Sequence, residues 1–495
     1  MEIKKQFKED FENANKVDLD FDLDQLEDNT RMTLFKNKST RNWILRGCSI
    51  LAVCLLLVGF CFQVGLLKIK VSAKFYKNKY SVSEIYIAES NSFKKLNNVS
   101  YPSKEYPTKS EISKEEAAAY NNFSSSTYQS ILETSNNANM SYSIAGLYSL
   151  MNEMSYGTTK EDLKDRFDNL LGLDKNGRSS FYEKLIKANS FGKENSTIQV
   201  KNAAFLDNKY EYSTEFVNDL TKLYCEAYQL DFDLDRKKIF EWIDQALKTS
   251  NYIDNRSLEI DKETMLFLFS TFYFKNDWYI KYRSDKNIKD NFYLNGNDKV
   301  QTTFMKHSYL IDCYYDYGNY LSVTDYYTDK VASVTYLVPK KVEDNIYELT
   351  KGKNIFVDKE ENKVVNSNPK ESIMVKLTTP KFSFKNDIDL KSSLGNLGFE
   401  DAFDRNINSF DKVIKENPAE KYNVYLQNIK QRNEIEFNEN GTIVRSLATA
   451  SFGAGSAGVT EMNTVEVKLN QPFIYIIKDI NGSPIFVGHV DNPKG

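Results

Sequence analysis

Residues 434–459 read EIEFNENGTIVRSLATASFGAGSAGV, and the two halves of this stretch differ in character. From Thr442 to Phe452 the residues are mostly β-branched, small or aliphatic, which favours an extended strand. From Gly453 to Gly458 the chain contains only Gly, Ala and Ser, too little side chain to hold a regular element by packing. A strand former that breaks off into such a stretch raises the question of which sheet the strand joins.

The strand-like half has two faces of different chemistry. Side chains alternate between the faces of a strand, so every second residue lies on the same side. One face holds small or modest, uncharged residues that suit burial in a sheet: Thr442, Val444, Ser446, Ala448 and Ala450. The other face is expected to point to solvent, where a charge is tolerated, and it holds Ile443, Arg445, Leu447 and Thr449.

Composition places the chain among globular proteins with a large core. It has 495 residues, of which 41% are hydrophobic and 14% aromatic, and the length alone would allow two or three domains. The formal net charge of -4 creates no basic field, so a nucleic-acid partner is not expected. Lys, Asn, Tyr, Phe and Ile are abundant while Pro and Gly are few, which fits an AT-rich genome and a bacterial source.

An apolar run, GCSILAVCLLLVGFCFQVGLL, occupies residues 47–67. At about 1.5 Å per residue its 21 residues would cross roughly 30 Å of hydrocarbon, so it predicts an uncleaved signal-anchor helix within residues 43–67. A cleaved signal peptide is disfavoured because about 40 residues precede the run and no small-x-small site follows it. Three of the five cysteines lie in this run, and the set shows neither metal-ligand spacing nor a disulfide framework.

The anchor predicts a single-pass membrane protein with three further parts. Residues 1–42 are expected to form a disordered, acidic, cytoplasmic tail; its alternating VDLDFDLD, at 17–24, would alternatively dock on the sheet edge of a partner. Residues 68–112 lack a sustained period and suit an extracellular tether. Residues 113–495 are expected to fold outside the cell, since long C-terminal domains are translocated largely regardless of charge.

Within residues 113–495 helices come first and strands later, which indicates an α+β fold. Apolar residues at helical spacing predict helices at 143–154, 213–228 and 236–250. Apolar runs predict strands at 331–339, 372–384, 433–438, 464–469, 473–479 and 485–490. Asn481-Gly482 suits a tight hairpin turn between the last two strands.

The motifs that accompany common enzyme chemistry are missing from the sequence. It contains no GxxxxGK[ST], GxGxxG, HExxH or CxxC, and neither His307 nor His489 lies in a metal-site or nucleophile-elbow pattern. His489 falls in an apolar strand, where a packed structural histidine is the better interpretation. We therefore expect no enzyme, no cofactor and no metal, although carboxylate pairs assembled by the fold stay open.

Five segments, in order along the chain, carry a family pattern: NANMSYSIAGLYSLMNEMSYGTTKEDL (137–163), VKNAAFLDNKYEYSTEFVNDLTKLYCEAYQLDFD (200–233), STFYFKNDWYIKY (270–282), LTTPKFSFKNDIDLKSSLGNLGFEDAFD (377–404), and FNENGTIVRSLATA with QPFIYIIKDINGSPIFVGHVDNP (437–450 and 471–493). Together they resemble the serpin family of serine protease inhibitors, from about residue 113 to the C-terminus. The resemblance implies a helical N-terminal part, a large mixed sheet with smaller sheets, and an exposed reactive loop.

The resemblance also explains the opening stretch. It implies that the loop follows a hinge, that a protease cuts the loop as a substrate, and that the first half then enters the large sheet with the acylated protease attached. The hinge residues implied are Glu439, Gly441, Thr442, Val444, Ser446, Ala448 and Ala450. The loop must therefore be able to form a strand and yet be kept out of the sheet before cleavage.

Two counts locate the bond that the protease would cut. Counting forward from Glu439 places it at Gly455-Ser456, whereas counting back from the QPF triplet at 471–473 places it at Glu461-Met462. We prefer Gly455-Ser456, because trapping depends on the length of the inserting half. Small residues before that bond suit an elastase-like or subtilisin-like serine protease; a cysteine protease is an alternative target, and the inhibitor is expected to be a monomer.

The resemblance further implies a region at which the large sheet opens. Its residues here are Ser141, Ser143, Ser270, Trp278 and Gln431, where Ser270 and Gln431 replace the family's usual Asn and His. The bulky residues after Thr442 also depart from the run of small residues usual in inhibitory members. A non-inhibitory serpin that serves as a binding or structural module, or a surface adhesin that uses the tail, tether and loop, are the alternatives.

Overall fold

The computed structural model describes residues 92–102, 104–135, 139–248, 264–294, 298–368, 371–415, 422–444 and 463–494. All of them belong to one compact unit, Glu89–Gly495. The predicted cytoplasmic tail, the predicted anchor and the first part of the predicted tether lie outside the described residues. Among the residues that are described, no helix is long and apolar enough to cross a bilayer.

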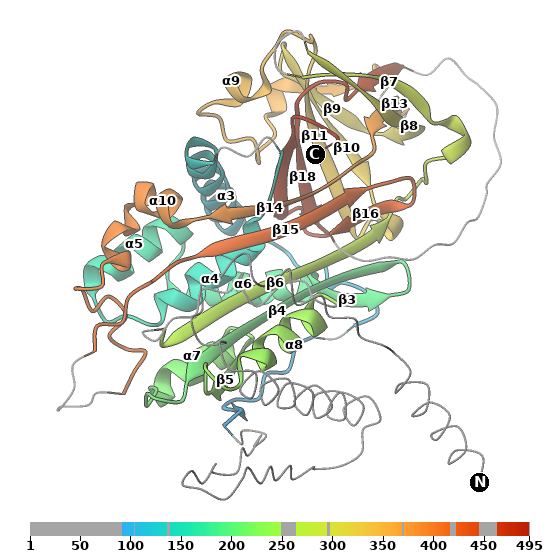
Figure 1. Cartoon of the computed structure of the whole chain (residues 1–495). Coiled ribbons are helices and arrows are strands. Elements are labelled where there is room, and N and C mark those ends of the chain that lie inside the picture. Colours follow the sequence, from blue (N-terminus) through green and yellow to red (C-terminus); the bar gives the residue numbers. More distant parts are fainter. Residues whose placement is uncertain are drawn as a thin grey trace, which may run out of the picture. The chain divides into compact units, whose positions relative to one another are not determined.

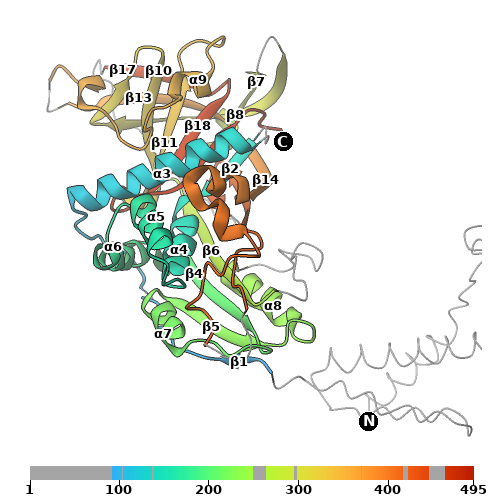
Figure 2. The same cartoon turned by 90° about the vertical axis from the view of Figure 1, so that its left-hand side faces the viewer.

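The longer helices lie in the first half of the described chain, as the sequence predicts, and strands alternate with them there (Figure 2). They are α3 (Lys114–Thr134), α4 (Ile144–Ser155), α5 (Glu161–Leu171), α6 (Lys175–Ala188), α7 (Thr214–Lys222), α8 (Arg236–Ala246), α9 (Ile346–Thr350) and α10 (Lys391–Leu394). Short helical turns lie at Ser284–Lys286, Thr328–Lys330, Glu360–Asn362, Gly395–Phe399 and Glu400–Phe403. The first long helix begins at a capping box, in which Ser113 Oγ accepts from the Glu116 backbone N–H and the Glu116 carboxylate accepts from that of Ser113.

One predicted helix, 213–228, is too long. The structure ends α7 at Lys222, and Tyr224 follows with a φ of 55°. This left-handed backbone cannot continue a right-handed helix, and Cys225–Leu230 forms a strand instead. Helical spacing had included Ala227, which is buried in that strand.

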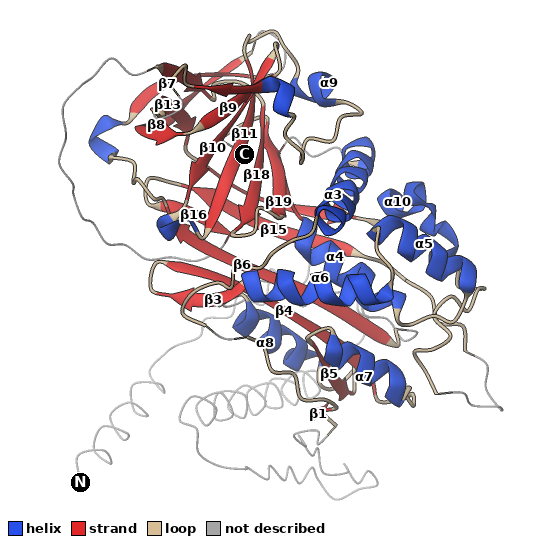
Figure 3. Cartoon of the chain, turned by 180° about the vertical axis from the view of Figure 1, so that it is seen from behind, coloured by secondary structure: helices blue, strands red, loops and turns tan. Residues whose placement is uncertain are grey.

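Strands form three sheets (Figure 3). The largest has eight strands: β1 (Lys94–Lys95), β5 (Cys225–Leu230), β4 (Ser196–Asp207), β6 (Leu266–Asp277), β16 (Gly441–Val444), β15 (Lys430–Phe437) and β14 (Phe382–Asp389) in that order, with β3 (Ser190–Lys193) paired to β4. The pair β4 and β5 is parallel and its neighbours are antiparallel, so the sheet is mixed.

The two smaller sheets hold most of the strands after residue 288, together with β2. The seven-stranded sheet has the order β12 (Lys363–Val365), β9 (Cys313–Asp316), β10 (Tyr320–Tyr326), β11 (Ala332–Pro339), β18 (Phe473–Asp479), β19 (Pro484–Val490) and β2 (Asn139–Ser143). The four-stranded sheet has the order β17 (Thr464–Lys468), β13 (Ile373–Pro380), β8 (Lys299–Ile311) and β7 (Ile288–Tyr293). Within the β18–β19 hairpin, Gly482 has a φ of 82°, as the Asn-Gly turn predicts.

The strand β6 is covered by helices on both faces. On one face its even-numbered residues, Phe272 and Phe274 among them, join the main core beside α4. On the other face Phe267, Phe269 and Tyr273 pack against the apolar side of α8. The arrangement places the centre of the large sheet between two helical layers.

The part of the predicted tether that is described lies against the domain. Lys94 and Lys95 pair with β5, and the backbone N–H of Ser110 donates to Asn481 Oδ1 at 2.8 Å. Between these two points, Gly192 N donates to Lys104 O at 3.0 Å. The described part of residues 68–112 is therefore attached to the domain by specific hydrogen bonds, although its sequence shows no periodicity.

Candidate functional site: the hinge and the gap in the large sheet

The first part of the predicted hinge, Gly441–Val444, forms a strand in the large sheet. β16 lies between β6 and β15 and is antiparallel to both (Figure 1). Thr442 stands opposite Asn276 on one side and Phe437 on the other. The alternation predicted from the sequence is confirmed for the first two positions, since Thr442 is fully buried while Ile443 is partly exposed.

Gly441 is required by the close approach of two strands. A Cβ atom at this position would lie 2.0 Å from the carbonyl oxygen of Asn276 and 2.7 Å from the Cα of Asp277. Both neighbours are backbone atoms, which cannot rotate out of the way as a side chain could. A glycine at this point therefore lets the hinge enter the sheet.

Two aromatic side chains fix the hinge beside β6. Trp278 is 1% exposed; its Nε1 donates to Asn438 O at 2.9 Å, and its backbone N donates to Asn440 O at 2.9 Å. Its ring stacks on Tyr327 with 4.8 Å between centroids, and the Tyr327 hydroxyl donates to Thr442 Oγ1 at 2.8 Å. The buried hydroxyl of Thr442 therefore has a partner, and its position in the sheet is specified.

Glu439 holds the other side of the hinge through charge. Its carboxylate accepts from Asn287 Nδ2 at 2.6 Å and lies 2.9 Å from Lys381 Nζ. Burial alone would raise the pKa of Glu439, but the hydrogen bonds from Lys381 and Asn287 outweigh it and leave the pKa lowered. The carboxylate is thus ionised and paired at neutral pH.

The lowered pKa predicts acid sensitivity of the hinge. A carboxylate whose pKa falls on folding stabilises the fold above its ordinary value of 4.5, and this contribution is lost as the pH falls through the lowered value. We expect the β16 amides to exchange hydrogen faster, relative to the intrinsic rate, as the pH drops from 5 to 3. The same titration of Glu439→Gln should show a much smaller change; an equal change would place the acid-sensitive group elsewhere.

Below β16 the sheet has a gap between β6 and β15. We use the term sheet gap for the cavity of about 570 Å³ between residues 264–272 and residues 423–434. Thr264 Oγ1 donates to Gln427 Oε1 at 2.8 Å across its far end. Leu150 and Met154 of α4 line the inner side, and Ile243 and Leu247, in and after α8, line the outer side.

Three of the predicted sheet-opening residues, Ser143, Ser270 and Gln431, line this gap. Ser270 and Gln431 lie on opposite walls of the gap. Gln431 does not bridge to Ser270; its amide holds the Ser143 backbone, with Oε1 accepting from N and Nε2 donating to O, both at 2.8 Å. Asn386 makes the same two bonds with Ser141, at 3.0 and 3.1 Å. The predicted serines contribute backbone groups to this network, and Ser143 Oγ caps α4.

Gln431 and Ser270 should therefore differ in their effect on stability. Gln431→Ala would leave a buried N–H and a buried C=O of Ser143 without partners, so we expect the free energy of unfolding to fall by about 2–4 kcal/mol. Ser270 Oγ is enclosed and has no hydrogen-bond partner within the described part of the chain. Ser270→Ala should therefore change the free energy of unfolding by less than about 0.5 kcal/mol. Urea unfolding measures both, and equal losses would contradict this assignment.

The structure brings together the hinge and the sheet-opening residues that the sequence predicts. It adds Tyr327, Lys381 and Asn386, which sequence reasoning missed because each bonds to a residue far away in the chain. Lys381 and Asn386 lie in the family segment 377–404, but that segment does not show which residues they bond to. The remaining predicted loop residues lie outside the described residues: Ser446, Ala448, Ala450, Gly455, Ser456, Glu461 and Met462. The backbone of Val444 is described and its side chain is not.

Comparison with known proteins identifies the family. The model of the serpin (serine protease inhibitor) family matches residues 118–493, and the chain belongs to this family. Serpin B10 of Papio anubis is 24% identical over 60% of this chain and 73% of its own length. The leukocyte elastase inhibitor of Xenopus laevis is 22% identical over 76% of this chain and 99% of its own.

A solved structure shows the same fold. The thermophilic serpin Tengpin in its native state superposes with a TM-score of 0.66 at 20% sequence identity, and the match covers 79% of this chain and 97% of Tengpin. The predicted serpin fold is confirmed. Both relatives named above come from vertebrates, so the bacterial source stays a prediction.

Proposed function

We propose that this chain inhibits serine proteases by the suicide mechanism of serpins, with its reactive loop as the substrate and the sheet gap as the receiving site. It would act as an inhibitor and not as an enzyme. The observation that supports this most is that β16 enters the top of a sheet whose gap continues in the same direction. The loop needs no new site, only the extension of a strand that has begun.

The register of β16 indicates which residues would fill the gap. Val444 stands opposite Phe274, so in an antiparallel extension residue 452 would stand opposite Leu266, the first residue of β6. On the other side Ile443 stands opposite Glu436, which places residue 448 opposite Gln431. Ala448 would then lie between Ser270 and Gln431, with a methyl group small enough for the core side.

The same register favours one cleavage site. An inserted strand that ends near Phe452 requires a cut not far beyond it, which agrees with Gly455-Ser456 better than with Glu461-Met462. Phe452, Gly453, Ala454 and Gly455 would meet the specificity pockets of the protease. Small residues there suit an elastase-like or subtilisin-like enzyme, and a similar relative is named as an elastase inhibitor.

We further propose that residues 43–67 anchor this serpin in a membrane, with the N-terminus in the cytoplasm and the serpin domain outside. The support is the apolar run at 47–67. Alkaline carbonate extraction of membranes from cells that produce the chain should leave it in the pellet, and protease added to intact cells should remove the domain. Release by carbonate would contradict the anchor.

One observation favours a non-inhibitory alternative. The side-chain amide of Gln431 is hydrogen-bonded to the Ser143 backbone. Among the described residues, no hydrogen bond joins Ser270 and Gln431 across the gap. If the sheet does not close around an inserted strand, the domain would serve as a binding module. The loop would then be cut without trapping the protease.

Incubation with proteases separates the two functions. The full chain in mild detergent is mixed with a subtilisin-like, an elastase-like and a chymotrypsin-like protease, and the mixture is boiled in dodecyl sulfate before electrophoresis. We expect a band at the summed mass of protease and inhibitor less the released C-terminal peptide, and this peptide should begin at Ser456. Active-site-blocked protease is the control. Complete cleavage with active protease left over would overturn the inhibitory function.

A further inference from the structure

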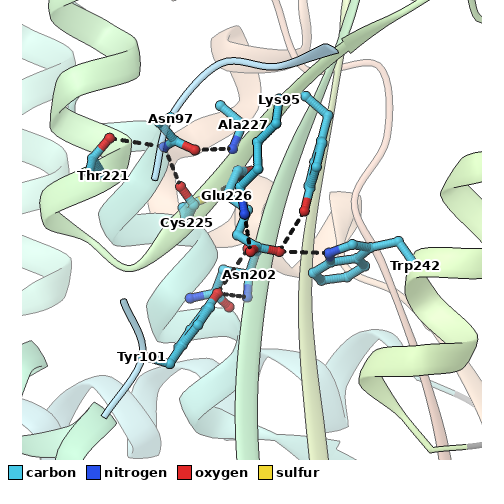
Figure 4. Close-up of polar contacts among 10 residues, drawn as sticks. Lys95, Asn97, Tyr101, Asn202, Thr221, Cys225, Glu226, Ala227 and Trp242 are labelled. Carbon is cyan, nitrogen blue, oxygen red and sulfur yellow. Dashed lines mark hydrogen bonds and ion pairs between the residues drawn. The ribbon is translucent and has the colours of Figure 1, made fainter. Parts of the chain in front are cut away.

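The segment that precedes the family match is attached to the edge of the large sheet at residues 92–101. Lys95 pairs with Tyr228 of β5, and the Leu96 N–H donates to Ala227 O at 2.8 Å. The Asn97 amide accepts from Ala227 N at 2.8 Å and donates to Cys225 O at 2.9 Å (Figure 4). This segment therefore has a specified register and is more than a connection to the rest of the chain.

Further along, Tyr101 is fixed to the neighbouring strand. Its hydroxyl accepts from Asn202 N at 2.9 Å and donates to Asn202 O at 3.1 Å, at the point where the pairing of β4 with β5 begins (Figure 4). Burial raises the pKa of Tyr101 well above its ordinary value, so the hydroxyl stays protonated and able to donate. Residues 92–101 thus bind β5 and β4 at several points.

Glu226 joins this segment to α8. Its carboxylate accepts from Lys95 Nζ at 2.7 Å, from Trp242 Nε1 at 2.9 Å and from the Tyr228 hydroxyl at 2.9 Å. The carboxylate is only 12% exposed, and although burial raises its pKa, the bonds from Lys95, Trp242 and Tyr228 leave the pKa lowered. An ionised, largely enclosed carboxylate needs this cation and these donors.

A second contact reaches the start of the same helix. Ser92 Oγ donates to the carboxylate of Asp235, the residue that precedes α8, and accepts from Asp231 N at 3.1 Å. Asp235 and Trp242, the two residues through which the segment is joined to α8, are separated by about two helical turns. The segment 92–95 therefore holds α8 at its start and near its middle.

The helix α8 covers the outer side of the sheet gap. Its Ile243 and the following Leu247 line the gap, and α8 packs on Phe267 and Phe269 of the adjacent wall. In the register of β16, residues 449 and 451 would stand opposite Phe269 and Phe267, directly under α8. A strand that enters the gap must therefore displace α8 or slide beneath it.

We propose that residues 92–101 form a latch that holds α8 over the sheet gap and so limits the rate at which a strand can enter the large sheet. The effect on strand insertion rests on the proposed function. The attachment of α8 rests on the contacts of Lys95, Ser92 and Glu226. Loss of the latch would leave the fold in place and make the gap easier to enter. A partner or protease that removes residues 92–101 from β5 would act on insertion without touching the loop.

Hydrogen exchange tests the latch without reference to inhibition. In the full chain in mild detergent we would compare Lys95→Met and Glu226→Gln with the matched control Lys94→Met, the neighbouring exposed residue of β1. We expect the amides of α8 to exchange about tenfold faster in the first two variants and to be unchanged in the control. Unchanged α8 exchange in both Lys95→Met and Glu226→Gln would overturn the latch.

Uptake of a peptide tests its consequence. The synthetic peptide RSLATASFGA, residues 445–454, should enter the gap about fivefold faster in Lys95→Met than in the parent or in Lys94→Met, as followed by native mass spectrometry. Faster α8 exchange with no trapped protease in the parent would refute the proposed function and keep the latch contact. A trapped protease in the parent with equal uptake in all variants would refute the latch and keep the proposed function.

Discussion

Under the proposed function, replacement of Gly441 by alanine should turn the chain from an inhibitor into a substrate. The added Cβ would lie 2.0 Å from the Asn276 carbonyl, so β16 must leave the sheet or β6 must shift. Either change separates Thr442 from Tyr327 and removes the strand from which insertion begins. Overpacking of this kind typically costs 1–3 kcal/mol, and a clash between backbones offers little room to relax. We expect the molar ratio of inhibitor consumed per protease trapped to rise at least about tenfold.

The matched control is Gly395→Ala. A Cβ at Gly395 meets no atom within 4 Å, and its backbone is in the right-handed helical region. This variant should trap protease as the parent does. Inhibition kept in Gly441→Ala, with β16 still in the sheet by hydrogen exchange, would show that the hinge does not need the close approach.

Cleavage of the loop should raise the melting temperature of the folded chain by about 20 °C. Insertion to residue 452 would give eight more residues a place between β6 and β15, at about 1 kcal/mol net for each backbone hydrogen bond. Each kcal/mol of stabilisation raises the melting temperature by roughly 2–4 °C in a chain of about 150–250 residues, and by less in a larger one. A gain on the order of 10 kcal/mol therefore corresponds to about 20 °C. Differential scanning calorimetry before and after a limited cut with the protease measures the shift.

Ala448→Glu should abolish that gain. If β16 were extended in the same register, this position would lie between Ser270 and Gln431 on the side of the core, where an unpaired carboxylate is strongly disfavoured. The matched control, Arg445→Glu, keeps a charge on the opposite face and should still melt at the higher temperature after the cut. Equal stabilisation of both variants would mean that the loop does not enter this gap.

Alternation along the strand and the family resemblance together predict residues that the structure places in β16 and along the sheet gap. Thr442 is buried and Ile443 is not, as period-2 alternation requires. Trp278 and Gln431 were found by resemblance, and both contact the hinge or line the gap. Their partners could not be found, since a bond such as that between Tyr327 and Thr442 joins residues 115 positions apart.

The errors of sequence reasoning have equally local causes. A left-handed φ at Tyr224 ends a helix that apolar spacing would have continued, and no residue type there announces it. The strand β1 has two residues, too few to show any period, so the segment around it was read as a tether. Its attachment depends on side chains such as Asn97 that bond to the backbone of another strand.

The strands before and after the reactive loop belong to different sheets. The segment before the loop ends in β16 of the large sheet, whereas β17 belongs to the four-stranded sheet and β18 and β19 lie inside the seven-stranded sheet. A cut within the loop would thus yield two polypeptides that stay interleaved without a covalent link. Once such a pair is unfolded, its reassembly becomes a bimolecular reaction whose rate depends on concentration. A molecule that has been cut and later denatured therefore has no unimolecular way back to its folded state.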